Sequence, residues 1–511
     1  MTRLKQLYRR GYRQLSVLLS TALAALVVAH ALATSGVRAQ VAPAGPSASE
    51  QQNPDQEEAQ PEKKISPQEA QELFRDVDAI LRFASQDTDL PVKKEVKRRL
   101  TTRDQVVSYL EKDMAEDKGT ERLRRSERVL KKFGLLPADF DLEGVLVKLL
   151  REQVAAYYDA KTKTVNLLNW IGPEQQRPVM AHELTHALQD QSFGLEKWMK
   201  RGDIDLDRKK NPTPEDFEQD EDSEARQAVV EGQAMVVLVD YMLAPTGKSL
   251  LSSPQIAAAL TEGMMTGASD SPEFQKAPIF LKESLTFPYR YGLDFEAELL
   301  RSGGKQKAFA AVFTNPPRTT REIMEPKTYL SGERMQPVSL PDFKRDFQNY
   351  ERFDIGAMGE FDVAILLDQY ASPEVSHTLY PHWRGGYYYA VQPKANAAAP
   401  LGLLYWSRWS DAESAARFAA IYAQGLTMRY QQVHEVPAPE ATSTGVWTEQ
   451  VPQSIPDSSH PKSLSGTHTW MTAEGEVVIR VQLEKVLITE SLDPWTSGRV
   501  EQELLGPTVT P

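Results

Sequence analysis

Two histidines four residues apart, with a glutamate beside the first, are the residues of this sequence best placed to do chemistry. They are His182, Glu183 and His186, in the run HELTH. Residues four apart lie one above the other on a helix, so both imidazoles can reach one Zn²⁺ at about 2.0–2.1 Å. Glu183 is offset by one residue and lies beside the ion, where it can take a proton from water. The spacing predicts a zinc site with Glu183 as general base.

A third ligand is needed, and the distribution of histidine restricts its type. The chain has 8 histidines, and between residues 40 and 376 only His182 and His186 occur. A third ligand from the same region must therefore be Asp or Glu. Glu231 is favoured, because its neighbours are apolar and a carboxylate buried among them would need a charge partner.

Glu224 and Asp190 remain as alternatives to Glu231. Glu224 lies seven residues before Glu231, which places it on the same face of a helix. Asp190 lies one turn beyond His186, and if it is not a ligand we expect it to orient an imidazole N–H.

The elements that must position these residues can be read from the surrounding pattern. Across residues 179–189 the only charged side chain is Glu183, so a helix over about 178–191, starting at Pro178, can be buried. A second helix is expected over about 222–243, where Gly232 and Ala234 would let two helices approach closely. Residues 154–168 predict a β-hairpin before the motif.

The ends of the ordered chain are marked by composition. Residues 1–39 carry six basic residues, no acid and an uncharged run at 15–33, which predicts a signal peptide or an uncleaved anchor. The protein is thus expected to be exported, and to be periplasmic, secreted or anchored in a membrane through 15–33. Residues 40–65 indicate a disordered linker. Ser66 then opens a helix with a capping box closed by Glu69.

Two domains are expected after the linker. Residues 66–345 are mainly helical, whereas residues 355–511 contain aromatic strand-like runs, a helix near 410–425 and a hairpin at 467–481. This predicts a smaller α+β domain of unknown role, with the aromatic residues at 387–389 in its strand core. The ten acids at 203–224 indicate a solvated loop, because they match no EF-hand spacing.

Composition excludes several classes of protein. The formal net charge is -12, and an acidic chain is a poor candidate for binding nucleic acid, because phosphate contacts need a basic surface. The chain has 0 cysteines, so a disulfide framework, a thiolate zinc site and a thiol nucleophile are all impossible.

The motif resembles that of the gluzincin class of zinc metallopeptidases, in which HExxH is followed by a glutamate on a later helix. The runs HELTHALQDQ at 182–191 and EGQA at 231–234 are most similar to a group of largely uncharacterised exported bacterial proteins regarded as zinc peptidases. The resemblance covers roughly residues 125–335 firmly, and the C-terminal domain loosely. It implies an α+β, mainly helical zincin-like domain. A substrate peptide would pair with the edge of the strand at Thr164–Leu168 or of its hairpin partner.

The chain departs from the gluzincin pattern at two places. Gluzincins often carry Asp four residues after the ligand glutamate, to support a zinc-bound histidine, and here that position is Met235. The usual oxyanion-stabilising histidine has no counterpart in the first domain. Tyr289, Arg290 and Tyr291 are the candidate donors in its place.

Two functions follow as expectations. The first is an exported zinc metallopeptidase that hydrolyses peptide bonds in a peptide or protein substrate, with Zn²⁺ held by His182, His186 and Glu231 and with Glu183 as general base. The second is a catalytically inactive zincin-like envelope protein, in which the first domain is a scaffold and the C-terminal domain binds partners.

Overall fold

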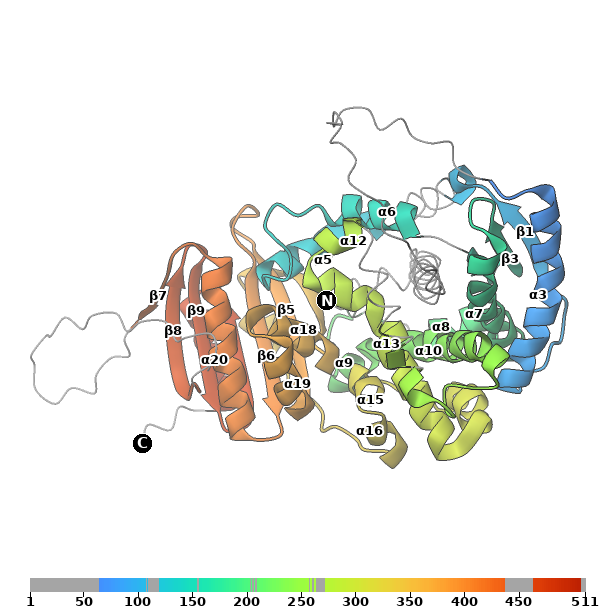
Figure 1. Ribbon diagram of the computed structural model, residues 1–511. Helices are drawn as coiled ribbons and strands as arrows, with labels where there is room; N and C mark the ends of the chain where they lie inside the picture. Colours follow the sequence, from blue (N-terminus) through green and yellow to red (C-terminus); the bar gives the residue numbers. More distant parts are fainter. Residues whose placement is uncertain are drawn as a thin grey trace, which may run out of the picture.

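The computed structural model describes residues 64–106, 108, 119–153, 156–202, 204, 206, 209–256, 258–259, 262, 272–436 and 463–506. The predicted signal or anchor segment at 1–39 and residues 40–63 of the predicted linker lie outside these residues. The described chain is a mixed α+β structure, with helices dominating the first half and a large sheet in the second (Figure 1).

The ordered chain begins with α3 (Pro67–Thr88), and its start is the predicted capping box. The backbone N of Glu69 donates to Oγ of Ser66 at 3.2 Å, and the backbone N of Ser66 donates to Oε2 of Glu69 at 2.6 Å. The apolar face of α3, which includes Leu73 and Val77, is buried against the helix that carries the HExxH motif. α3 therefore forms the outer wall behind that helix.

A small sheet lies beside the motif helix. The predicted hairpin is present as β2 (Ala156–Asp159) and β3 (Thr164–Leu168), which pair antiparallel. The sequence analysis did not predict β1 (Lys97–Thr101), which pairs with β3 in parallel and gives the strand order β1-β3-β2. Both edges of β3 are therefore occupied, whereas β2 has a described strand on one side only.

The motif helix is α7 (Pro173–Phe193), and it begins earlier than predicted. Gly172 is its N-cap and Pro173 occupies the first helical position, so the predicted start at Pro178 is wrong. A proline at the first helical position does not destabilise the helix, because a backbone N–H at that position would have no partner within the helix. Pro178 lies inside the helix and removes one backbone hydrogen bond, and the helix continues because nearly all of its length beyond Pro178 is buried.

Two further helices complete the core around α7. These are α10 (Asp222–Leu243), which matches the predicted second helix, and α13 (Ile279–Lys305). A Cβ added at Gly232 would lie 2.3 Å from the carbonyl of Gly292, and one added at Gly292 would lie 2.2 Å from the carbonyl oxygen of Ala228. The predicted close approach at Gly232 is thus a backbone contact between α10 and α13, which only glycine permits.

α13 ends in a kink followed by a wide turn. Gly304 has φ 64°, and the chain then forms the π-helix η3 (Gln306–Ala311) and the short α14 (Val312–Thr314). A π-helical turn changes the direction of the backbone carbonyls relative to a regular helix. The carbonyl of Ala308, in this turn, accepts a hydrogen bond from a side chain of α10.

The second half of the chain is built on a seven-stranded antiparallel sheet of order β4-β5-β6-β10-β9-β8-β7. Its strands are β4 (Tyr350–Ala357), β5 (Trp383–Pro393), β6 (Gly402–Trp409), β7 (Val433–Val436), β8 (Gly466–Thr472), β9 (Gly475–Gln482) and β10 (Lys485–Glu490). The predicted hairpin at 467–481 is β8 and β9, and the predicted helix is α20 (Ala412–Arg429).

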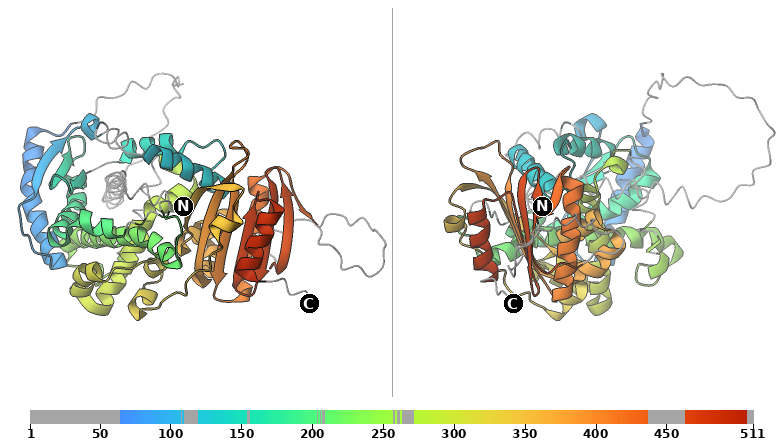
Figure 2. Two further views of the ribbon diagram at one scale, coloured as in Figure 1. Left: turned by 180° about the vertical axis from the view of Figure 1, so that it is seen from behind. Right: turned by 90° about the vertical axis from the view of Figure 1, so that its left-hand side faces the viewer.

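Both faces of this sheet are covered, which explains its aromatic strands. α20 lies on one face and α21 (Pro494–Leu505) on the other (Figure 2). Along β5, Tyr388 packs in the same apolar cluster as α20, whereas Tyr387 and Tyr389 pack with α21. Successive strand residues point to opposite faces. The prediction that residues 387–389 belong to a strand core is confirmed.

The remaining helices connect and cover these parts. They are α5 (Gly119–Lys132), α6 (Leu142–Gln153), α8 (Leu195–Arg201), α9 (Pro214–Asp220), η2 (Ala244–Thr246), α12 (Pro272–Lys276), α15 (Thr320–Met324), α16 (Pro326–Ser331), α17 (Phe343–Asp346), α18 (Glu360–Tyr370), α19 (Pro373–Leu379) and η4 (Tyr380–His382).

Several acids of the segment 203–224 are buried, so the prediction of a solvated loop is wrong for them. Asp220 and Glu221 lie where α9 meets α10 and are 0% and 3% exposed. Oδ2 of Asp220 accepts from the backbone N of Ala357 at 3.0 Å, and Oε2 of Glu221 accepts from the backbone N and hydroxyl of Thr320. Asp220 thus binds a backbone N–H of the large sheet and Glu221 binds one of helix α15, which a count of charges cannot reveal.

One helical stretch in the described part of the chain, Pro214–Thr246, has the length and hydropathy to cross a membrane. It contains α10, and the most apolar part of the stretch is 72% buried inside the protein. A core helix of a globular protein has the same composition, so this stretch adds nothing to the prediction of export or anchoring.

Candidate metal centre

The side chains of His182, His186 and Glu231 meet at one point between α7 and α10. Nε2 of His182 lies 3.1 Å from Nε2 of His186 and 3.1 Å from Oε2 of Glu231, and Nε2 of His186 lies 3.4 Å from the same oxygen. All three side chains are buried. Two nitrogens and one oxygen thus form a small triangle that could hold a metal ion.

The local structure explains this convergence. His182 and His186 are one turn apart on α7, with ring planes at 90° and centroids 4.7 Å apart, so that both Nε2 atoms face α10. α10 packs directly on α7 and presents Glu231, which is 1% exposed, at the same height. A carboxylate in this apolar surrounding needs opposite charge nearby, and the two imidazoles supply it.

Neither of the alternative third ligands belongs to this group. Among the described residues the cluster contains Glu231 and not Glu224 or Asp190. Asp190 has other partners, since its Oδ2 accepts from the hydroxyl of Tyr158 at 2.8 Å and pairs with Nζ of Lys163 at 2.6 Å. The expectation that Asp190 orients an imidazole is therefore wrong.

Gln189 takes the role that was expected of Asp190. Its Oε1 lies 2.9 Å from Nδ1 of His186, one turn earlier on α7. Its Nε2 donates to the backbone carbonyl of Val230 at 3.0 Å, so that Gln189 also holds α10 next to Glu231. The sequence signal was present in the three-residue spacing from His186, but an uncharged glutamine is common on helices and did not stand out.

Glu183 lies next to the triangle and faces the edge strand β2. Its Oε2 accepts a hydrogen bond of 2.7 Å from the backbone N of Tyr158, and its Oε1 has no hydrogen-bond partner in the described part of the chain. Because Tyr158 donates to Glu183, its N–H points away from β3. The strand at Thr164–Leu168 has both edges paired, so it cannot offer an edge to a peptide, whereas its hairpin partner β2 has a described strand on one side only.

The pKa values at this site reflect burial and close opposite charges. Burial raises the pKa of Glu183 to about 8, against the opposing charge of His186. Burial alone would lower the pKa of His186, but the carboxylate of Glu231 raises it to about 9. Burial likewise opposes ionisation of Glu231, yet His186 and His182 lower its pKa to about 2. The pKa of His182 is lowered, mainly by burial.

This pattern assigns the charges in the metal-free protein. At neutral pH these shifts favour an ionised Glu231, a protonated His186, a neutral His182 and a protonated Glu183. A metal ligand must present a lone pair, so binding of a cation requires His186 to release its Nε2 proton. The metal-free triangle is thus held together by an ion pair that a metal would replace.

The three candidate oxyanion donors lie in different surroundings. Tyr289 on α13 is buried, with its ring centroid 6.2 Å from that of His182. Arg290 is exposed, and Tyr291 packs against Phe287 and Phe361. Of the three, Tyr289 is the one next to the triangle.

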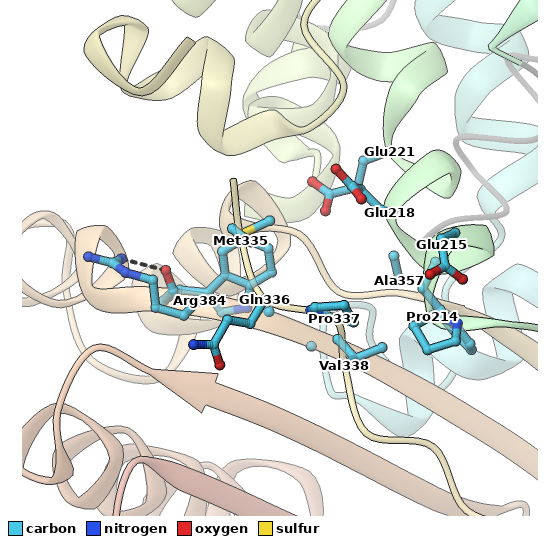
Figure 3. Close-up of a pocket in the computed structure, with 14 residues that line it drawn as sticks. Pro214, Glu215, Glu218, Glu221, Met335, Gln336, Pro337, Val338, Ala357 and Arg384 are labelled. Carbon is cyan, nitrogen blue, oxygen red and sulfur yellow. Dashed lines mark hydrogen bonds between the residues drawn. The ribbon is translucent and has the colours of Figure 1, made fainter. Parts of the chain in front are cut away.

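A cavity of about 70 Å³ lies elsewhere, between α9 and the large sheet. It is lined by α9 residues, by residues 335–338 and by the start of β5, and Glu218 and Glu221 lie side by side on one wall (Figure 3). These carboxylates have partners, since Glu218 pairs with Arg318 at 2.6 Å and Glu221 binds Thr320. The cavity includes none of the three converging residues.

Compared with protein-family models, with curated proteins and with solved structures, this chain gives no match.

Proposed function

We propose that this protein is an exported zinc metallopeptidase of the gluzincin type, which hydrolyses peptide bonds with Glu183 as general base. The observation that carries the proposal is the convergence of His182, His186 and Glu231, with Glu183 beside them. Export rests on the basic and apolar composition of residues 1–39.

The distances between the three atoms fit zinc. Ligand atoms about 2.0–2.1 Å from a tetrahedral ion lie roughly 3.3 Å from one another. The three separations in the triangle are 3.1, 3.1 and 3.4 Å. Two imidazole nitrogens and one carboxylate oxygen are a common catalytic zinc set, whereas Ca²⁺ and Mg²⁺ prefer oxygen ligands. A zinc ion there would lower the pKa of water towards 7 and polarise a carbonyl group.

Two features of the chain favour hydrolysis over simple metal storage. Oε1 of Glu183 has no hydrogen-bond partner among the residues that the structure describes, which is what a group that accepts a proton from water requires. After accepting this proton, Glu183 can pass it to the amine that leaves. An iron site can use the same two histidines and one carboxylate, but such a site has no need of this glutamate.

The chain also supplies groups to hold a peptide and its developing charge. The outer side of β2 has no described partner strand, and there we expect an extended peptide to pair beside Tyr158, whose own N–H is bound by Glu183. The phenol of Tyr289 is the donor best placed to stabilise an oxyanion at the same site.

Metal analysis combined with one substitution tests the proposal. The purified protein is expected to bind one zinc ion and to hydrolyse a denatured protein substrate, and Glu183→Gln is expected to keep the zinc but to lose the hydrolysis. Glu174→Gln is the matched control, because Glu174 is exposed in the first turn of the same helix. A wild-type protein that binds zinc without hydrolysing any substrate would support the inactive scaffold instead.

A further inference from the structure

Two buried glutamines, Gln189 and Gln233, form a row of hydrogen bonds that begins at His186 and leads away from the triangle. Oε1 of Gln189 lies 2.9 Å from Nδ1 of His186, and Nε2 of Gln189 donates to Oε1 of Gln233 at 2.8 Å. Nε2 of Gln233 donates in turn to the carbonyl oxygen of Ala308 at 2.6 Å. Both glutamines and Ala308 are fully buried, so no water replaces these partners.

Which group donates and which accepts in each hydrogen bond of this row is determined by the last acceptor, the carbonyl of Ala308. The carbonyl of Ala308 can only accept, so the N–H side of Gln233 must face it, and the oxygen of Gln233 must face Gln189. That oxygen also can only accept, as can the carbonyl of Val230, and Gln189 therefore directs its NH₂ group at both. The oxygen of Gln189 is left for His186.

This direction determines which nitrogen of His186 keeps a proton. Because Oε1 of Gln189 accepts, Nδ1 of His186 must carry hydrogen in every protonation state of the ring. When the ring is neutral, its lone pair is on Nε2, the atom that faces His182 and Glu231. The row thus selects the tautomer of His186 that can bind a metal.

We propose that Gln189 and Gln233 form a directed hydrogen-bond relay that positions His186 for its metal, with the carbonyl of Ala308 as the fixed end. The inference rests on the proposed function and extends it, since it names what supports a ligand of the zinc site. Both glutamines are positioning residues, and Gln233 acts only through Gln189.

The relay also accounts for the residue found where gluzincins often have an aspartate. Met235, four residues after Glu231, offers a histidine ligand only a weakly accepting thioether in place of a carboxylate. Support for His186 comes instead from its own helix, and Gln233 on α10 locks that support in place. A neutral amide behind the imidazole raises its basicity less than a carboxylate would, so that more positive charge stays on the metal.

The far end of the relay is uncharged as well. The side-chain amide of Gln233 lies against the carboxyl of Glu296 on α13, which is 0% exposed. Burial raises the pKa of Glu296 well above its ordinary value, which favours the neutral form of this carboxyl. α13 and the π-helical turn after it thus complete the relay without adding a charge near the site.

Zinc affinity in three matched variants tests the relay. We expect Gln189→Leu and Gln233→Leu each to weaken zinc binding about 10–100-fold, measured by competition with a chelator. Gln176→Leu is the control, because Gln176 is a fully buried glutamine of α7 that bonds to Leu168 and Ile171 and not to the relay. This control is expected to lower the urea midpoint without changing the zinc affinity.

Two further measurements separate positioning from a loss of stability. If Gln233 acts through Gln189, the double variant should bind zinc as weakly as Gln189→Leu alone, whereas independent structural effects would multiply. The visible absorption of bound Co²⁺ should change in the relay variants and stay unchanged in Gln176→Leu. Relay variants with the zinc affinity of the control, or losses that multiply, would overturn the relay.

The outcomes also distinguish the relay from the function on which it rests. If the wild-type protein binds no zinc, the proposed function and the relay fall together. If the wild type binds one zinc ion through His182, His186 and Glu231 but Gln189→Leu binds it equally well, the relay alone is wrong.

Discussion

The backbone N–H of Tyr158 donates a hydrogen bond of 2.7 Å to Oε2 of Glu183, and this contact joins the outer side of β2 to the motif helix. The hydroxyl of the same tyrosine donates to Oδ2 of Asp190 at 2.8 Å, two turns further along α7. Tyr158 thus ties the edge strand to α7 twice. The position of a peptide paired with β2 would be set relative to Glu183 by these two bonds.

The first prediction concerns the carboxylate that ties the hairpin to α7. Asp190→Ala would leave the hydroxyl of Tyr158 and the backbone N of Leu195 without their acceptor, and is expected to lower the free energy of unfolding by about 2–4 kcal/mol. Lys163→Met removes only a half-exposed ion-pair partner and should cost about 0–1 kcal/mol. Urea unfolding of both variants measures this difference, and equal losses would contradict it.

The second prediction separates the two glutamates of α10. Glu231→Gln is expected to weaken zinc binding by more than the roughly 10–100-fold that loss of an outer partner costs, because a ligand of the triangle is removed. Glu224→Gln, on the same face two turns earlier, should keep the wild-type affinity. Chelator competition gives both constants. Loss of binding in Glu224→Gln with retention in Glu231→Gln would mean that the third ligand was assigned to the wrong residue.

The third prediction is a pH dependence of the metal-free protein. The pKa of His186 is raised from 6.5 to about 9 on folding, so its contribution to stability is complete below pH 6.5 and is lost as the pH rises through 9. Glu183, whose pKa is raised from 4.5 to about 8, changes stability in the same direction. The urea midpoint in the presence of a chelator should fall between pH 6.5 and 9.

Metal loading provides the control for this pH dependence. Zinc displaces the Nε2 proton of His186, so the urea midpoint of the loaded protein should fall less over the same pH range. At pH 7.5 binding should release at least one proton, which calorimetry in buffers of different ionisation enthalpy can count. Binding without proton release would contradict the ion pair between His186 and Glu231.

The fourth prediction tests the backbone contact between α10 and α13. Gly292→Ala would place a methyl group 2.2 Å from the carbonyl oxygen of Ala228, and is expected to cost about 1–3 kcal/mol or more and to weaken zinc binding, because α10 must move. Gly498→Ala in α21 has open space around the new methyl group and should stabilise the protein by about 0.5–1 kcal/mol. If both variants had the same thermal midpoint, the close approach would not matter.

Local features of this protein could be predicted because they depend on neighbours in the chain. The capping box at Ser66 uses residues three apart, the hairpin of β2 and β3 is joined by a short turn, and His182 and His186 share a helix face through their spacing. Glu231 was favoured as third ligand from the apolar residues around it, since burial of a carboxylate demands a partner.

Other features were decided only when distant segments packed together. Spacing along α10 allows either Glu224 or Glu231 to face α7, and the height at which the two helices pack brings Glu231 to the histidines. Because β1 pairs with the second edge of β3, β3 is the central strand of the small sheet, and β2 is the edge strand beside Glu183. The orientation of the side-chain amide of Gln189 depends, through Gln233, on the carbonyl of Ala308, more than a hundred residues away. Hydrogen bonds between buried groups form wherever tertiary packing brings a donor to an acceptor, and the sequence alone does not show where that is.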